Sequence, residues 1–294
     1  MQPNKDSLSN TLIVATSLCL VCALVVSSAA VVLKPYQTKN AQLDRIKNIL
    51  AVTGFTKADM DSAGGAKELY DERFDVKIVD LRTGEEAPEQ CKAAVEKARG
   101  RTIQNIYAEY DQLWASKTPP AKGLSVALTK KEDPAGIKKR EIYSQVFVLK
   151  NKAGDVERYV FPVRGNGLWS LMQGYLAVEP DFQTVAGLTF YQQAETPGLG
   201  GEVENKQWKK KWLKKQLYDG QGDVALKVIK GDQSQNPNGV DALSGATITS
   251  NGVTNMLEFW MGDDGFGPFI KRQASGAINQ SNDQASIDGG NHVR

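Results

Sequence analysis

The chain has 294 residues, with 36 Lys or Arg against 34 Asp or Glu, and hydrophobic residues make up 41% of it. This near balance of charge excludes a general polyanion-binding protein, because nucleic-acid-binding domains are usually strongly basic, and we expect no nucleic acid among its partners. Three cysteines, Cys19, Cys22 and Cys91, and one histidine, His292, are too few for a disulfide framework or a zinc site, so we expect no metal, and a redox role would need an organic cofactor.

The first predicted element is a membrane-spanning helix over residues 11–33. This stretch, TLIVATSLCLVCALVVSSAAVVL, carries no charge and can cross about 30 Å of hydrocarbon. A cleaved signal peptide, the alternative, would have a shorter apolar stretch of roughly 7–15 residues and a basic start, but only Lys5 precedes the span. We therefore expect a short tail at 1–10 and a retained helix, in which Cys19 and Cys22 are small packing residues.

The charges that flank this span favour one orientation. More basic side chains follow the span than precede it, so the positive-inside rule would place the large C-terminal part in the cytoplasm. The flanking charges are Lys5 and Asp6 before the span, and Lys34, Lys39, Arg45 and Lys47, against Asp44, after it.

An entry region over residues 34–141 is expected to be a mixture of helix, strand and loop. Apolar side chains recur at helical spacing over 43–50, which predicts a membrane-proximal helix. Residues 74–78 alternate between apolar and charged side chains, as a strand does. Residues 88–99 have a helical pattern, and the charged stretch 128–141 is typical of a loop.

From residue 142 the pattern changes to strands, which predicts an α+β domain built on an antiparallel sheet. The polar, Gly- and Ser-rich residues 273–294 are expected to be disordered. The predicted strands cover 142–150 and 156–163, which form a hairpin, then 167–180, 184–193 and 225–231, and the predicted helices cover 206–217 and 250–261.

The stretch KQWKKKWLKKQL (206–217) interleaves two tryptophans with lysines. A basic aromatic helix can bind anionic lipid or a partner protein. We favour an ordinary helix, with Trp208, Trp212 and Leu213 in the core and the lysines in solvent.

Two further stretches are candidates for binding a ligand. ETPGLGGEV (195–203) is rich in glycine, which lets a backbone approach a flat or anionic ligand, although an ordinary loop has the same composition. SGATITS (244–250) precedes a helix whose apolar face is Val253, Met256, Leu257 and Trp260. We expect Thr249 or Ser250 to cap that helix. Thr247 lies just upstream, where free N–H groups hold a phosphate, but the lysine of a nucleotide-binding phosphate loop is missing.

DALSGAT (241–247) resembles the flavinylation motif of the FMN-binding domain family, D-x-x-[ST]-G-A-[ST]. Three other stretches, GLWSLMQGYLAVEPD (167–181), ETPGLGGEV (195–203) and DGFGPF (264–269), are similar to the C subunit of sodium-translocating NADH:quinone reductases. The single N-terminal span is also similar. The resemblance runs from residue 11 to about residue 271, and it implies an FMN-binding domain over residues 142–272.

The resemblance implies that the FMN phosphate is esterified to Thr247 by a separate flavin transferase, so the site needs no base of its own. The flavin ring then does the redox chemistry, and we expect no catalytic side chain. Asp241 would be read by the transferase or would brace the turn. Trp169 would contact the ring or lie in the core, and Lys230 would favour an anionic reduced flavin. Ser244, Gly245 and Ala246 would surround the phosphate, and Glu195, Thr196, Pro197, Gly198, Leu199 and Gly200 would lie against the ring, with Leu199 as its apolar contact.

The family also implies partners and a location. The chain would be an electron-transfer component of a complex of six subunits in the bacterial inner membrane, in contact with lipid, and the other subunits would bind NADH and quinone. The flavin domain would lie on the periplasmic side, where the transferase acts, and we follow this implication over the charge bias. The alternatives are a flavoprotein subunit of a ferredoxin:NAD oxidoreductase complex, and a non-redox anchored module that binds a partner through residues 206–217.

Overall fold

The computed structural model describes residues 8–88 and 125–275. After Leu43 the chain divides into two compact units. The helix predicted over 88–99 lies outside the described residues except for residue 88, and so do Cys91 and His292. The predicted disordered tail lies outside them except for residues 273–275, which are helical and belong to a helix that begins at residue 267.

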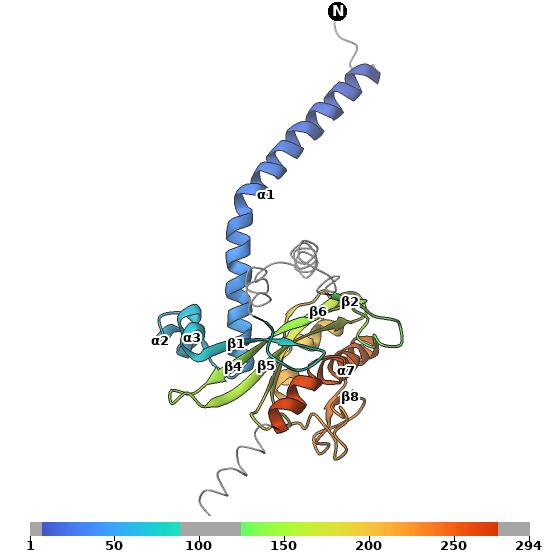
Figure 1. The fold of residues 1–294 in the computed structure, drawn as a ribbon. Helices are drawn as coiled ribbons and strands as arrows, with labels where there is room; N and C mark the ends of the chain where they lie inside the picture. The colour runs from blue at the N-terminus through green and yellow to red at the C-terminus, as the bar shows by residue number, and fades with distance from the viewer. Residues whose placement is uncertain (1–7, 89–124, 276–294) are drawn as a thin grey trace, which may run out of the picture. The chain divides into compact units, whose positions relative to one another are not determined.

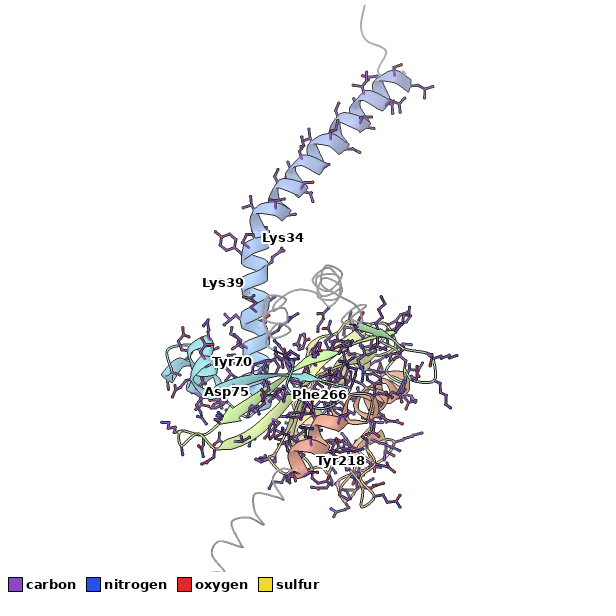
Figure 2. All side chains as sticks on the ribbon, viewed as in Figure 1. Lys34, Lys39, Tyr70, Asp75, Tyr218 and Phe266 are labelled. Atoms are coloured by element: carbon purple, nitrogen blue, oxygen red, sulfur yellow. The ribbon has the colours of Figure 1, made fainter. Side chains whose placement is uncertain are left out.

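The first unit consists of most of α1, a helix that spans Leu8–Val52. The apolar part of α1 is long and apolar enough to cross a membrane, and none of it is buried within the protein. The helix bends close to Lys34 (Figure 2), beside Pro35. Proline bends a helix because it lacks an N–H donor and its ring crowds the preceding turn. Cys19 and Cys22 are free thiols exposed on this helix.

The last turns of α1 belong to the second unit, in which Ile49 and Leu50 are buried. The helix predicted over 43–50 is therefore confirmed, as a continuation of the apolar helix. Two short helices follow, α2 (Lys57–Ser62) and α3 (Ala66–Arg73), and α3 leads directly into the first strand.

An antiparallel sheet of five strands forms the centre of the second unit (Figure 1). The strand order is β1-β4-β5-β6-β7, so a strand of the predicted entry region pairs with a strand of the predicted flavin domain. The sheet confirms the α+β fold class and the strands expected from apolar alternation. The strands span Phe74–Asp80 (β1), Tyr143–Lys150 (β4), Val156–Asn166 (β5), Leu171–Val178 (β6) and Val185–Gln192 (β7).

Helix α7 (Thr247–Met261) packs on β5 through the apolar face that the sequence predicts (Figure 1). The side chains of this face, Val253, Met256, Leu257 and Trp260, are fully buried. Glycine permits the close approach of the two elements, because a Cβ added at Gly252 would lie 2.3 Å from the carbonyl oxygen of Asn166 at the end of β5. The first turn of α7 is thereby held next to the loop that joins β5 and β6.

Two small sheets complete the second unit. β2 (Ser125–Ala127) and β3 (Lys139–Glu141) pair antiparallel, so the prediction of a loop over 128–141 is wrong at its end. The reason is a turn in which the Asp133 carboxylate accepts the backbone N–H groups of Ile137 and Lys138. β8 (Lys227–Ile229) and β9 (Gly239–Asp241) pair in parallel, and β8 lies within the strand predicted over 225–231.

The basic aromatic segment is a shorter helix than predicted. A 3-10 turn, η1 (Gly200–Glu204), precedes α6, which spans only Lys206–Lys210. The chain then turns through Lys214, whose φ is 63° and whose N–H bonds to the carbonyl oxygen of Val185 in β7. Pairing with β7 therefore replaces further helix. Trp208 and Trp212 are buried as expected, at 6% and 0% exposure, but Leu213 is 50% exposed and the prediction that it lies in the core is wrong.

We predict that Gly252→Ala destabilises the protein by about 1–3 kcal/mol, because the added methyl group would force α7 away from the backbone of β5. Gly220→Ala is the matched control, since a Cβ at Gly220 meets nothing within 4 Å and should change stability by less than about 0.5 kcal/mol. Urea unfolding of the full chain in detergent measures both. Equal stability of the two variants would show that the helix can move without cost.

Candidate cofactor pocket

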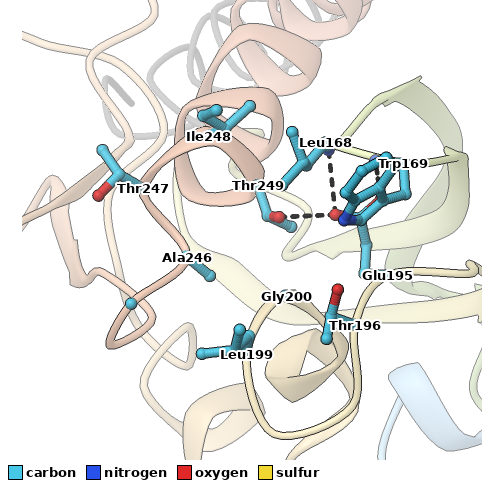
Figure 3. Close-up of a pocket in the computed structure, with 11 residues that line it drawn as sticks. Leu168, Trp169, Glu195, Thr196, Leu199, Gly200, Ala246, Thr247, Ile248 and Thr249 are labelled. Carbon is cyan, nitrogen blue, oxygen red and sulfur yellow. Dashed lines mark hydrogen bonds between the residues drawn. The ribbon is translucent and has the colours of Figure 1, made fainter.

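Three segments far apart in the sequence surround a small pocket beside the first turn of α7 (Figure 3). Its volume is about 230 Å³, below the roughly 300–1,000 Å³ of pockets that enclose a whole drug-sized ligand. A ligand as large as a flavin would thus remain partly exposed. The lining residues are Leu168 and Trp169 of the β5–β6 loop, Glu195, Thr196, Leu199 and Gly200 of the segment after β7, and Gly245, Ala246, Thr247, Ile248 and Thr249 at the start of α7.

The buried carboxylate of Glu195 holds these segments together (Figure 3). Its Oε1 atom accepts hydrogen bonds from the backbone N–H groups of Trp169 and Ser170 and from the Ser170 hydroxyl, each at 3.0 Å. Its Oε2 atom accepts from the N–H of Leu168 at 3.0 Å and from the Thr249 hydroxyl at 2.6 Å. One side chain therefore connects the β5–β6 loop with the first turn of α7.

These bonds keep Glu195 ionised although it is only 5% exposed. Burial by itself raises the pKa of the Glu195 carboxyl, but the bonds from Thr249, Trp169, Leu168 and Ser170 favour the charged form and hold the pKa below its ordinary value of 4.5. The pocket thus has a negative charge in its wall at neutral pH.

Helix α7 begins three residues earlier than predicted, at Thr247, with Ala246 in the N-cap position. The prediction of Thr249 or Ser250 as the cap is wrong, because both hydroxyls have tertiary partners. Thr249 donates to Glu195, and the Ser250 hydroxyl accepts the N–H of Leu243 at 3.1 Å. Within the described residues no side chain caps α7, so the N–H groups of its first turn have no side-chain acceptor there.

The hydroxyl groups of SGATITS differ sharply in their surroundings. Thr249 and Ser250 are 2% and 1% exposed and are hydrogen-bonded. Thr247 and Ser244 are exposed, and neither hydroxyl has a hydrogen bond to any residue in the described part of the chain. Thr247 lines the pocket, whereas Ser244 does not. Thr247 is therefore the hydroxyl-bearing residue of this stretch that is both exposed and among the residues that line the pocket.

The turn before α7 requires glycine at position 245. Gly245 has a φ of 70°, in the left-handed region that L side chains rarely adopt. A Cβ at this position would also lie 2.9 Å from Cδ2 of Leu199 on the opposite wall. The glycine of the motif therefore both makes the turn and leaves room for Leu199.

Asp241, the acidic residue of the motif, ends β9 and does not line the pocket. Its carboxylate forms an ion pair with Lys211 and accepts the N–H of Gln233 at 2.7 Å, and its carbonyl oxygen accepts from Nε1 of Trp208 at 2.8 Å. The hydrogen bond from Lys211 holds the pKa of the Asp241 carboxyl below its ordinary value. These contacts hold Asp241 itself in place, and both predicted roles, bracing of the turn and recognition by a transferase, stay predictions.

The structure brings most of the predicted site residues together. Trp169 is 71% exposed at the pocket mouth, which excludes its alternative role as a core residue. The predicted residues that line the pocket are Trp169, Glu195, Thr196, Leu199, Gly200, Gly245, Ala246 and Thr247, and those that do not are Pro197, Gly198, Lys230, Asp241 and Ser244.

Sequence reasoning missed Leu168, Ile248 and Thr249 as lining residues. Ile248 is apolar but lies off the buried face of α7 and is 57% exposed. An apolar residue outside the apolar face of a predicted helix indicates a possible ligand contact, so the helical pattern could have identified Ile248. Leu168, 47% exposed beside Trp169, is a comparable case. Thr249 had no such signal, because its role depends on a bond to a residue 54 positions away.

The chain is similar to known proteins over a range that includes every residue that lines the pocket. The FMN-binding domain family matches residues 167–262. The chain is 40% identical over 279 residues to the C subunit of the Na(+)-translocating NADH-quinone reductase of Pasteurella multocida, covering 95% of this chain and 99% of that protein. It is 43% identical over 277 residues to the corresponding protein of Pseudomonas aeruginosa, covering 93% and 98%. The crystal structure of Shewanella oneidensis NqrC superposes with a TM-score of 0.67 and 28% identity, covering 81% of this chain and 99% of that one.

We predict that Glu195→Gln lowers stability at pH 7 by about 1–3 kcal/mol, because buried donors lose a charged acceptor. The pKa of Glu195 is lower in the folded chain than its ordinary 4.5, so its contribution is complete above about pH 4.5 and is lost as the pH falls through the folded pKa. The gap between wild type and variant should therefore narrow from pH 7 to pH 3.

Thermal unfolding of the full chain in detergent, followed by tryptophan fluorescence, measures this gap. Glu204→Gln is the control, because Glu204 is exposed and, among the described residues, accepts a hydrogen bond from Gln193 alone. A gap that stays constant with pH would contradict the assignment of an ionised Glu195.

Proposed function

Because the chain belongs to the family of C subunits of the Na+-translocating NADH-quinone reductases, we propose that it carries FMN, joined through its phosphate to Thr247, and that this flavin transfers electrons within such a complex. Members of the family are subunits of an oxidoreductase complex, and this chain contains their FMN-binding domain. The observation that carries the covalent assignment is the position of Thr247, an exposed hydroxyl without a hydrogen bond in the described structure, in the wall of the pocket.

The start of α7 suits a phosphate ester at this position. Thr247 is the first residue of a helix that has no side-chain cap, and its neighbours supply backbone N–H groups that can bind phosphate oxygens. The positive end of the helix dipole also favours the negative charge of the ester. The bound phosphate would thus take the place of the missing cap.

The surroundings of Thr247 support attachment by another enzyme. The carboxylate that lines the pocket, Glu195, is buried and accepts a hydrogen bond from the Thr249 hydroxyl, so it is not placed to act as a base for Thr247. The chain's single histidine, His292, lies outside the described residues. A separate flavin transferase would therefore supply the base that removes the Thr247 proton.

Apolar side chains would hold the flavin ring. Leu168, Trp169, Leu199 and Ile248 are 47%, 71%, 43% and 57% exposed around the pocket, and a planar aromatic ring would cover them. When bound, FMN supplies one- and two-electron chemistry, while the chain orients the ring. Because the pocket is small and open, part of the ring would stay accessible to electron partners.

We also propose that α1 anchors the chain in the inner membrane by a single span. There it would contact lipid and the other subunits of a complex of six subunits. Its length and apolar surface support this role. The flavin domain would then lie on the periplasmic side, as the family implies, against the weak charge bias of Lys34, Lys39, Arg45 and Lys47. NADH and quinone would bind elsewhere in the complex, since the sequence carries no dinucleotide-binding fingerprint.

We predict that Thr247→Val abolishes covalent flavin and leaves a folded domain, because valine keeps the size of threonine and removes its hydroxyl. In-gel flavin fluorescence after denaturing electrophoresis measures the attachment, in cells that express a flavin transferase and export the domain. Ser244→Thr is the control, since it keeps the motif and an exposed hydroxyl at position 244. A fluorescent band in Thr247→Val would assign the ester to another hydroxyl, and a colourless wild type would favour the non-redox alternative.

We predict that Leu199→Ala keeps the covalent flavin and shifts its midpoint potential, because the ring would lose an apolar contact and gain water. Leu213→Ala is the control, as Leu213 is similarly exposed but does not line the pocket. Spectroelectrochemical titration of both flavinylated chains measures the potentials. Equal potentials in wild type and Leu199→Ala would remove Leu199 from the ring contacts.

A further inference from the structure

We propose that Glu195 is a positioning residue for the flavin: its carboxylate fixes the two walls of the pocket relative to each other and places an uncompensated negative charge beside the ring. The part about the ring rests on the proposed function. The part about the walls concerns the protein alone, and it can be tested without a cofactor.

The fixing of the walls follows from the hydrogen bonds of the carboxylate. Glu195 accepts from three consecutive backbone N–H groups, those of Leu168, Trp169 and Ser170, each at 3.0 Å. Oε2 of Glu195 also accepts a hydrogen bond from the hydroxyl of Thr249 in the first turn of α7, two residues after Thr247. The loop that presents Trp169 and the helix that presents Thr247 therefore share one acceptor.

The space around the carboxylate is also shaped for it. A Cβ at Gly167 would lie 2.6 Å from the Glu195 carboxyl carbon. A Cβ at Gly200 would lie 2.6 Å from the Thr249 hydroxyl and 2.9 Å from Oε2 of Glu195. Glycines on both sides thus leave room for the carboxylate and its donors. A glutamine at 195 would turn an NH2 group toward N–H donors, which leaves buried groups unpaired.

The charge of Glu195 has no cationic partner within the described ranges. All five hydrogen bonds come from neutral groups, the backbone N–H of residues 168–170 and the hydroxyls of Ser170 and Thr249. No Lys or Arg of the described chain forms an ion pair with it, although ten other ion pairs are present there. A net negative charge in a poorly solvated wall opposes the addition of electrons to a neighbouring ring.

Amide hydrogen exchange of the full chain in detergent tests the fixing of the walls. In Glu195→Gln the amides of Leu168, Trp169 and Ser170 should exchange at least about tenfold faster than in wild type, since each loses a bond to a charged acceptor. Glu204→Gln is the matched control, the same change on an exposed side chain outside the pocket. Equal exchange in Glu195→Gln and Glu204→Gln would overturn this part of the proposal.

The same exchange measurement on flavin-free Thr247→Val separates this inference from the proposed function. The amides of Leu168, Trp169 and Ser170 should be as protected in this variant as in wild type, whether or not the wild-type chain carries flavin. If Glu195→Gln does not fold, Thr249→Val tests the same point, because it removes the hydrogen bond between Glu195 and α7. The Ser250 amide, which donates to the carbonyl oxygen of Ala246 in the first turn of α7, should then exchange faster than in wild type. Unchanged exchange in that variant would contradict the proposal.

Midpoint potentials of the flavinylated variants test the charge. Glu195→Gln should raise the potential relative to wild type and Glu204→Gln, because a negative charge is removed. Thr249→Val keeps the carboxylate, so its potential should lie closer to that of wild type. An equal rise in Thr249→Val and Glu195→Gln would assign the effect to pocket geometry and overturn the role of the charge.

Discussion

The close packing of α7 on the end of β5 is the constraint on which the site depends. Gly252 permits the contact with the carbonyl oxygen of Asn166, and Gly165 faces Met256 across the same interface, where an added Cβ would lie 2.8 Å from that side chain. Because α7 cannot slide along the strand without clashes, its first turn is fixed beside the β5–β6 loop. The position of Thr247 relative to Trp169 is therefore set by backbone packing in the core, several residues away from the pocket itself.

Two local features of the pocket run against the ordinary rules of stability. A helix of 15 residues begins without a side-chain cap, although Thr249 and Ser250 are close enough to the start to suggest one. A carboxylate is buried without a cationic partner among the described residues, where all of its hydrogen-bond donors are neutral. As a result, backbone N–H groups without a side-chain acceptor at the start of α7 lie close to a negative charge in the wall of the pocket. A site that binds an anionic group next to a redox ring would use both.

The sequence predicts the sheet and the buried face of α7 well, because each depends on a local apolar period of two or of about 3.6 residues. The sequence mispredicts the ends of helices where a hydrogen bond to a residue distant in the sequence sets them. The start of α7 is misplaced because Thr249 bonds to Glu195 and Ser250 to the backbone of Leu243, and α6 ends early because its chain pairs with Val185. The motif residues Gly245 and Thr247 were identified through family resemblance, whereas the function of Glu195 as a common acceptor becomes visible only in three dimensions.

Covalent attachment explains why so small a pocket is sufficient under the proposed function. A flavin held without a covalent bond depends on buried area and hydrogen bonds for its occupancy, and both must offset the lost freedom of the free ligand. An ester at Thr247 removes that requirement, so the side chains around the ring need only orient it. The apolar rim of Leu168, Trp169, Leu199 and Ile248 can then stay open to a partner, and Glu195 can hold a charge that would weaken the binding of an untethered anionic cofactor.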